Sequence, residues 1–117
     1  MGNKVTWFEV AGKDGDKLRE FYGKSFGWQF NQPPGMNYGM VDPSDAGIGG
    51  GIAGDSEDGG HLTFYVEVDD VQAALDKVEG LGGKKVMGPD QVPGGPEIAM
   101  FTDPEGHMVG LVKPQPM

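Results

Sequence analysis

The chain has 117 residues, a net charge of −9 and a sequence pI near 4.4. Such an acidic surface repels phosphate backbones and anionic lipid, so nucleic acid and membranes are poor candidate partners, and we interpret the charge as serving solubility. The absence of cysteine excludes disulfides, thiolate catalysis and zinc–sulfur sites. The first five residues carry no apolar stretch typical of a signal peptide, and we therefore expect a cytoplasmic location.

The first half predicts a strand, a helix and three short strands. Residues 4–11 are rich in β-branched and aromatic side chains, which favours a strand. A helix follows, capped by Asp14 or Asp16 and ended by Gly27. Its buried stripe is predicted from apolar residues at helical spacing: Leu18, Phe21, Tyr22 and Phe26. The short strands are predicted at 28–32, 36–42 and 46–53.

The same pattern restarts after an acidic, glycine-rich linker at 54–60. A strand is predicted at 61–68, with Asp69 and Asp70 as the cap of a helix that ends at Gly82-Gly83. The buried stripe of this helix is predicted from four apolar residues: Val71, Ala74, Leu75 and Val78. Three more strands are predicted at 84–87, 97–102 and 107–112.

The two halves repeat each other at constant offsets. Three pairs lie 56 positions apart: Val10 and Val66, Asp14 and Asp70, Gly27 and Gly83. Three further pairs lie 61 positions apart: Asp42-Pro43 and Asp103-Pro104, Ile48 and Val109, Gly49 and Gly110. One βαβββ unit exposes a sheet face that it cannot cover alone. The sequence therefore predicts an α+β fold in a single domain, 1–117. Two tandem βαβββ modules, at about 4–54 and 61–113, form a curved mixed sheet around a cleft, with the helices packed outside.

Several motifs resemble a known superfamily. They are Trp7-Phe8-Glu9-Val10, Phe21-Tyr22-Gly23-Lys24-Ser25-Phe26-Gly27-Trp28, Val66-Glu67-Val68-Asp69-Asp70-Val71, Leu81-Gly82-Gly83-Lys84 and Phe101-Thr102-Asp103-Pro104-Glu105-Gly106-His107. This set resembles the vicinal oxygen chelate superfamily, which includes glyoxalase I, bleomycin-resistance proteins and extradiol dioxygenases. The resemblance covers nearly the whole chain and implies the fold given above. The superfold hosts lyases, epimerases, dioxygenases, thiol transferases and antibiotic-sequestering binders, so it leaves the activity open.

The resemblance also implies one divalent metal, held by four His, Glu or Gln side chains from the first and last strands of each unit. Counted from the motifs, these four positions fall on Trp7, Gly49, Thr63 and Gly110. None of these is a normal side-chain ligand for such a cation. We therefore expect no metal and no other cofactor, with one divalent metal as the alternative.

Strand alternation predicts a ligand-binding cleft. Its floor is expected to be Trp7, Glu9, Thr63 and Tyr65, because alternate residues of each strand face away from the helix. Met40 and Met100 are expected as adaptable apolar walls, and Gly49 and Gly110 leave room for a ligand. Flat aromatic area beside a few polar groups suits a small organic molecule.

The catalytic residues are unknown, and Glu9 is the one candidate. It could act as a general base or hold a cationic or hydroxylated ligand, or it could be a strand-end side chain that reaches water or a lysine. His61 and His107 could join Glu9 around a metal. We expect both histidines to face solvent, because one begins a strand and the other adjoins a turn. The glycine-rich segment 47–52 is not read as a phosphate loop, since no lysine or helix start follows it.

These residues and the resemblance predict a small-molecule-binding, glyoxalase- or bleomycin-resistance-like protein without the usual metal ligands. It would bind or sequester a small hydrophobic or aromatic compound, and the resemblance implies a homodimer. The alternative is an enzyme, a glyoxalase-like lyase or isomerase that uses a divalent metal or Glu9 as acid–base. A third interpretation is a structural dimer whose cleft is filled by Trp7. The identity of the ligand stays open.

Overall fold

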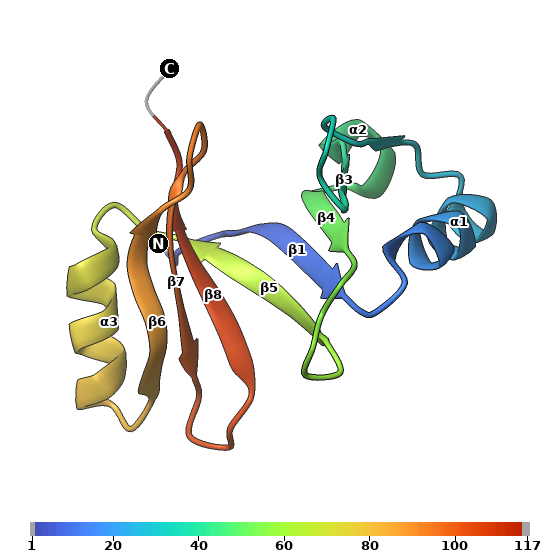
Figure 1. Cartoon of the computed structure of the whole chain (residues 1–117). Helices are drawn as coiled ribbons and strands as arrows, with labels where there is room; N and C mark the ends of the chain where they lie inside the picture. Colours follow the sequence, from blue (N-terminus) through green and yellow to red (C-terminus); the bar gives the residue numbers. More distant parts are fainter. Residues whose placement is uncertain (1, 116–117) are drawn as a thin grey trace. The chain divides into compact units, whose positions relative to one another are not determined.

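The computed structural model describes residues 2–115 and contains two compact units (Figure 1). The first unit comprises Thr6–Thr63, and the second comprises the residues up to Val5 and those from Phe64 onward. The chain passes between them within two strands, β1 (Val5–Ala11) and β5 (His61–Glu67).

Each unit has the order βαβββ. After β1 the first has α1 (Gly15–Phe26), β2 (Phe30–Asn31), β3 (Tyr38–Val41), the short α2 (Pro43–Ala46) and β4 (Gly49–Ala53), with strand order β2-β3-β4-β1. After β5 the second has α3 (Val71–Gly80), β6 (Lys84–Gln91), β7 (Glu97–Thr102) and β8 (Met108–Lys113), with strand order β5-β8-β7-β6. The first strand pairs in parallel with the last in both units, and the remaining pairs are antiparallel. The predicted α+β class and the two βαβββ modules are confirmed.

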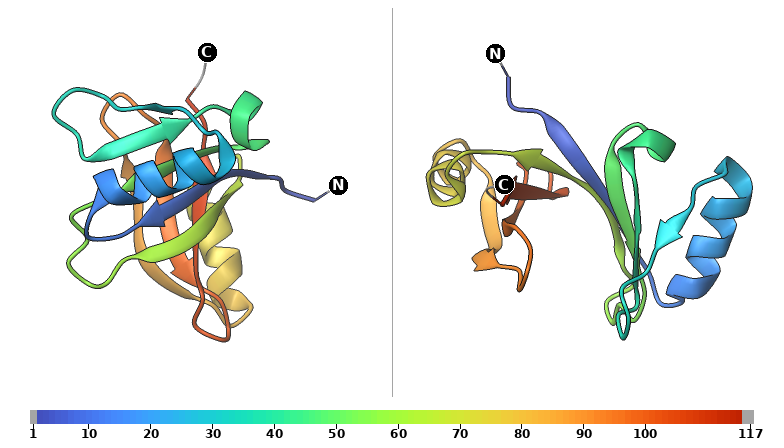
Figure 2. Two further views of the ribbon diagram at one scale, coloured as in Figure 1. Left: turned by 90° about the vertical axis from the view of Figure 1, so that its right-hand side faces the viewer. Right: turned by 90° about the horizontal axis from the view of Figure 1, so that it is seen from above.

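The second unit has the apolar core that the sequence predicts. Val71 and Leu75 of α3 are buried and pack against Ala99 and Leu111 of the sheet. Ala74 and Val66 pack against the same cluster. Figure 2 shows α3 running along the strands of this unit.

The first unit differs, because the predicted stripe of α1 is partly wrong. Phe21 and Phe26 are 60% and 63% exposed, whereas Arg19 is only 7% exposed. The guanidinium of Arg19 can be buried because it donates to the Ile52 carbonyl at 2.8 Å and to Asn37 Oδ1 at 3.0 Å. A salt bridge of 2.7 Å to Asp16 completes its contacts. Helical spacing therefore predicted the stripe only in part: Leu18 and Tyr22 are half-buried, whereas Phe21 and Phe26 are exposed.

Aromatic rings form the rest of the contact between α1 and its sheet. Tyr22 stacks on Trp28 with an interplanar angle of 9° and centroids 5.9 Å apart. Phe8 of β1 meets the same indole at 5.5 Å. Phe8 thus faces α1, and its strand neighbours Trp7 and Glu9 face the opposite side of the sheet.

The short helix α2 moves the start of β4. A strand was expected from residue 46, but Asp42 caps a helical turn by accepting from Ser44 N at 2.9 Å, and β4 begins only at Gly49. The sheet register pairs Glu9 with Gly51 in the first unit and Tyr65 with Gly110 in the second. Glu9 and Tyr65 are repeat mates at the 56-residue offset (65 − 9), so the structural counterpart of Gly110 is Gly51. The sequence analysis took Gly49 as the repeat mate of Gly110, and the register corrects this to Gly51. The shift of two residues arises because α2 lengthens the first unit between Asp42 and β4.

Two further points concern the exposure and the length of strands. Leu62 and Phe64 alternate with Thr63 and Tyr65 on β5 and share the face of Val66, which packs against the α3 core, but they are 75% and 44% exposed. β2 is shorter than expected, and β6 extends to Gln91 rather than ending near residue 87. Within the described part of the chain, none of the helices has the length and apolar character needed to span a bilayer.

Candidate functional site

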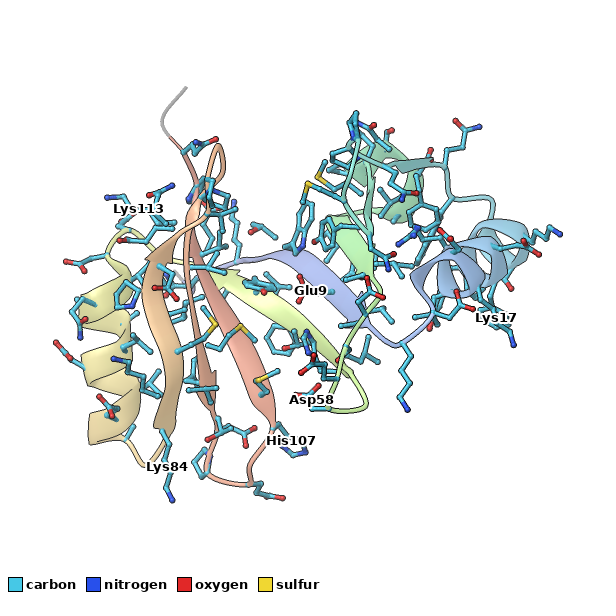
Figure 3. The ribbon with its side chains drawn as sticks, viewed as in Figure 1. Glu9, Lys17, Asp58, Lys84, His107 and Lys113 are labelled. Carbon is cyan, nitrogen blue, oxygen red and sulfur yellow. The ribbon has the colours of Figure 1, made fainter. Side chains whose placement is uncertain are left out.

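Four side chains form a hydrogen-bonded chain on the face of the first unit's sheet that points away from α1, here called the distal face. Trp7 Nε1 donates to Tyr38 Oη at 3.2 Å. Tyr38 Oη donates to Glu9 Oε2 at 3.4 Å, and His61 Nε2 lies 2.8 Å from Glu9 Oε1. We call these four residues the Glu9 network, because the hydrogen bonds of Tyr38 and His61 converge on the Glu9 carboxylate. Figure 3 labels Glu9 on β1.

The sheet register explains why these side chains meet. Met40 pairs with Gly51, which pairs with Glu9, so these residues share one face across three strands. Tyr38 lies two residues before Met40 on β3 and therefore points to the same face. The tyrosine thus reaches Glu9 from a strand that is not adjacent to β1.

Glycines on β4 make room for the aromatic rings of the network. A Cβ on Gly49 would lie 2.9 Å from Cζ3 of Trp7, so the indole lies over the backbone of the neighbouring strand. A Cβ on Gly51 would collide with the hydroxyl of Tyr38. The ring of Trp7 therefore lies along the sheet within its own unit, and Tyr38 occupies the space that a side chain at position 51 would need.

His61 is a correction to the sequence analysis. It was expected to face solvent, but its side chain is 27% exposed and it pairs with Glu9, which is 18% exposed. Because a carboxylate only accepts hydrogen bonds, the His61 nitrogen that faces Glu9 carries a proton. His107 does face solvent, with a side chain that is 72% exposed. It contacts Asp103 in the turn between β7 and β8 (Figure 3).

The predicted site residues divide between the units. Five lie in the first: Trp7, Glu9, Met40, Gly49 and Thr63. Tyr65, Met100 and Gly110 lie in the second. In that unit Gly110 pairs with both Tyr65 and Met100, and the place of a Cβ on Gly110 is taken by the Tyr65 ring. Thr63, Tyr65 and Met100 are buried.

The donors present do not fit the metal that the resemblance implies. Trp7, Thr63, Gly110 and either Gly49 or Gly51 supply no imidazole or carboxylate. Among residues 2–115, no group of three or more His, Asp or Glu side chains gathers around a point. Glu9 and His61 form only a pair, and they contact each other. We therefore derive no chemistry from a metal.

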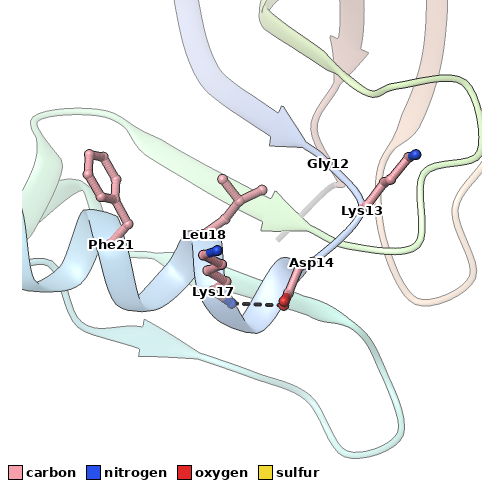
Figure 4. A pocket seen from close by; sticks show the side chains of 6 residues that line it. All are labelled: Gly12, Lys13, Asp14, Lys17, Leu18 and Phe21. Carbon is pink, nitrogen blue, oxygen red and sulfur yellow. Dashed lines mark hydrogen bonds between the residues drawn. The ribbon is translucent and has the colours of Figure 1, made fainter.

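Two hollows lie elsewhere in the first unit, along α1. One of about 390 Å³ is lined by Gly12, Lys13, Asp14, Lys17, Leu18 and Phe21 (Figure 4). An adjoining one of about 410 Å³ is lined by Lys17, Glu20, Phe21, Lys24 and Ser25. None of these residues belongs to the Glu9 network. The Asp14 carboxylate already caps α1 by accepting from Lys17 N, and Glu20 pairs with Lys24. We therefore take the Glu9 network as the candidate site, because its polar groups converge on one carboxylate.

The loop that precedes β5 contains a carboxyl group with a shifted pKa, Asp58. Hydrogen bonds from the Ser56 side chain and the Gly60 backbone hold the pKa of Asp58 below its usual value, with a smaller contribution from the charge of His61. Figure 3 labels Asp58 in this loop. Of the Glu9 and Asp58 carboxyl groups, Glu9 is the one whose contact with His61 is a hydrogen bond.

Two residues of this site were absent from the predicted set, Tyr38 and His61. Alternation on β3 placed Tyr38 with Met40, which was in the set, so the pattern contained a signal for it. No local pattern pointed to the partner of His61, because Glu9 lies 52 residues earlier in the chain.

Comparisons with known proteins agree with this architecture. A "putative glyoxylase CFP32" of Mycobacterium bovis is 27% identical over 122 residues, covering 96% of this chain and 44% of the relative. The chain thus spans less than half the length of that relative. A "glyoxylase-like domain-containing protein" of Didymella fabae is 26% identical, covering 92% of this chain and 91% of the relative. The crystal structure of methylmalonyl-CoA epimerase from Mycobacterium tuberculosis matches with a TM-score of 0.68 at 14% identity, covering 96% and 88% of the two chains, which shows a shared fold.

The model of the Glyoxalase/Bleomycin resistance protein/Dioxygenase superfamily matches residues 4–111, nearly the whole chain. With the duplicated βαβββ architecture and the matching relatives, this establishes that the chain belongs to the glyoxalase/bleomycin resistance protein/dioxygenase superfamily.

Proposed function

We propose that this chain binds a small compound with a flat aromatic or apolar part and at least one polar group, at the distal face of the first unit and without a metal. The observation that carries the proposal is the Glu9 network, in which an indole, a phenol, a carboxylate and an imidazole are linked by hydrogen bonds. Binding or sequestration then requires no chemical step.

The network supplies both parts that such a site needs. The indole of Trp7 gives rigid apolar area, and its orientation is fixed by Tyr38 and by the flat surface at Gly49. Glu9 and His61 give a polar end that is partly exposed. A ligand that stacks on the indole and reaches the carboxylate or imidazole gains affinity from the first contact and orientation from the second.

The two tryptophans allow a direct test. Trp28→Phe leaves Trp7 as the sole indole, and Trp7→Phe leaves Trp28, which packs against Tyr22 away from the network. In titrations with a panel of aromatic antibiotics and simple phenols, we expect saturable fluorescence changes in Trp28→Phe and much weaker binding by Trp7→Phe in calorimetry. Equal binding by the two variants would contradict the proposed location.

The second candidate is a metal-independent isomerase, favoured by the contact between the Glu9 carboxylate and the His61 imidazole. Several structural neighbours are named as methylmalonyl-CoA epimerases, so methylmalonyl-CoA is the first compound to test. An isomerase would exchange the hydrogen beside the carbonyl for deuterium in heavy water, as seen by NMR, and Glu9→Gln would lose this exchange. An exchange rate no greater than that without protein would reject this candidate.

We also propose a homodimer in the cytoplasm, in line with the sequence analysis. Light scattering coupled to size-exclusion chromatography tests the dimer, and a monomer at micromolar concentration would contradict it. Cell fractionation tests the location.

A further inference from the structure

The hydrogen bonds of the Glu9 network have a direction, and this direction distinguishes the roles of Glu9 and His61. Trp7 donates to Tyr38, and Tyr38 donates to Glu9. His61 presents Nε2 to the other oxygen of the same carboxylate. Both carboxylate oxygens therefore accept hydrogen bonds within the network, and the network holds Glu9 in place.

The imidazole is placed differently. Its contact with Glu9 uses Nε2, and a carboxylate partner on one ring nitrogen fixes the proton there in the neutral ring. The second nitrogen, Nδ1, is then an acceptor. The side chain of His61 is more exposed than that of Glu9, 27% against 18%, so a ligand reaches the imidazole more readily.

We propose that His61 is the proton acceptor of this site and that Glu9 is a positioning residue. Because the ligand must give a proton to His61, the preferred ligands are aromatic compounds with an acidic hydroxyl group, such as phenols or enols. This inference rests on the proposed function and names its ligand class. The O–H bond of the ligand breaks, its electron pair stays on the oxygen, and the proton forms an N–H bond at Nδ1. The resulting imidazolium lies between the ligand oxyanion and the Glu9 carboxylate, each of which stabilises it.

The groups that face His61 are given by its contacts. Its Nε2 lies 2.8 Å from Glu9 Oε1, and Tyr38 donates to the other oxygen of that carboxylate. Asp58 lies in the loop that precedes β5. An imidazolium formed at His61 would therefore have the Glu9 carboxylate as its hydrogen-bond partner.

The test uses 4-nitrophenol, whose anion absorbs visible light, and 4-nitroanisole, which has the same ring without the proton. The unmodified chain should bind nitrophenol about tenfold more tightly than nitroanisole, because only nitrophenol forms the charge-assisted contact. The bound nitrophenol should show the nitrophenolate band below the pH at which the free compound ionises. His61→Gln should lose both the band and the preference. The matched control His107→Gln should retain them, since His107 lies in an exposed turn and contacts Asp103.

The outcomes separate this inference from the proposed function. Binding of both compounds without the anion band, or an unchanged band in His61→Gln, overturns the role of His61 and leaves the binding proposal standing. Binding of neither compound, with no change in Trp7 fluorescence across the aromatic panel, overturns both.

A second measurement needs no ligand. In nitrogen NMR of the histidine rings, with His107→Gln used to assign the signals, neutral His61 should be protonated at Nε2. Glu9→Gln should shift the ring towards a mixture of the two tautomers, as expected for a positioning residue. A ring protonated at Nδ1 in the unmodified protein would overturn the inference, whatever the ligands show.

Discussion

The two units place different side chains at the same position of their helices. Arg19 of α1 and Leu75 of α3 are repeat mates, and both are buried, at 7% and 0% exposure. The leucine packs among apolar residues of the sheet, whereas the arginine donates to a backbone carbonyl and to an asparagine. The same position of the repeat therefore holds an apolar side chain in one copy and a hydrogen-bonded arginine in the other, although the first unit also buries Val41 and Ile52.

The same contrast extends to the opposite faces of the two sheets. The distal face of the first unit carries the Glu9 network, and the matching face of the second carries Tyr65 beside Gly110 and Met100. The side chains at matching positions of the two sheets thus differ, with Glu9 in the first copy where the second has Tyr65. Duplication has therefore preserved the strand and helix framework but not the chemistry of the positions within it.

The largest effect on stability is expected from the apolar core of the second unit. Leu75→Ala should lower the free energy of unfolding by about 2–5 kcal/mol, because it leaves a cavity at a fully buried site. Denaturant unfolding followed by circular dichroism measures this loss. Leu81→Ala, at a residue 73% exposed, is the control and should change the stability little. Similar losses in the two variants would contradict the core assignment.

Arg19→Leu makes the first helix resemble the second at this position. We expect a loss of about 1–3 kcal/mol, because the Ile52 carbonyl and the Asn37 side chain lose their donor. The same unfolding experiment gives the value. Stability equal to or above that of the unmodified protein would mean that these groups need no arginine, and that the two cores are interchangeable.

The helix caps should behave alike in the two units. Asp14 accepts from Lys17 N and Asp70 accepts from Ala73 N, each at 3.0 Å. Replacement of either by alanine should cost about 1 kcal/mol. The double variant should show the sum of the two losses, since the caps lie in separate units. Clearly unequal losses would show that the two helices do not have equivalent starts.

The smallest expected effect is the pH dependence contributed by the two Asp-Pro turns. The Ser44 backbone N–H lowers the pKa of Asp42, and the His107 backbone N–H lowers that of Asp103. A carboxyl whose pKa is lower in the folded state stabilises the fold above its ordinary pKa of 3.8, and this contribution disappears as the pH falls through the folded value. Asp42→Asn and Asp103→Asn should each flatten the decline of stability in acid. Unchanged slopes in unfolding curves recorded from neutral to acidic pH would contradict this.

Local patterns and the repeat predicted most of the fold. Capping aspartates and terminal glycines placed both helices, and the apolar stripe of α3 identified its buried residues. The stripe of α1 was misread because a buried arginine satisfied by distant carbonyl oxygens looks like a surface residue in a pattern of hydropathy. Only the fold brings those oxygens to the helix.

The site was predicted less completely, for a related reason. Trp7 and Glu9 followed from alternation within one strand. The pairing of Glu9 with His61 depends on contact between distant parts of the chain, and no spacing rule encodes it. The register error at Gly49 arose because the Asp42-Pro43 motif was counted as if no extra residues followed it, whereas α2 inserts a turn there.

The tyrosines that stand over glycines also constrain how this protein could evolve. Gly51 and Gly110 occupy corresponding strand positions, and a side chain at either would collide with Tyr38 or Tyr65. A single mutation that introduced a carboxylate at one of these positions would therefore disrupt packing before it could create a ligand for a cation. Acquisition of a metal would require paired changes in each copy, glycine and tyrosine together, with a less stable intermediate between them. Selection would act against this less stable intermediate, so single substitutions are a poor route from this protein to a metal-binding one.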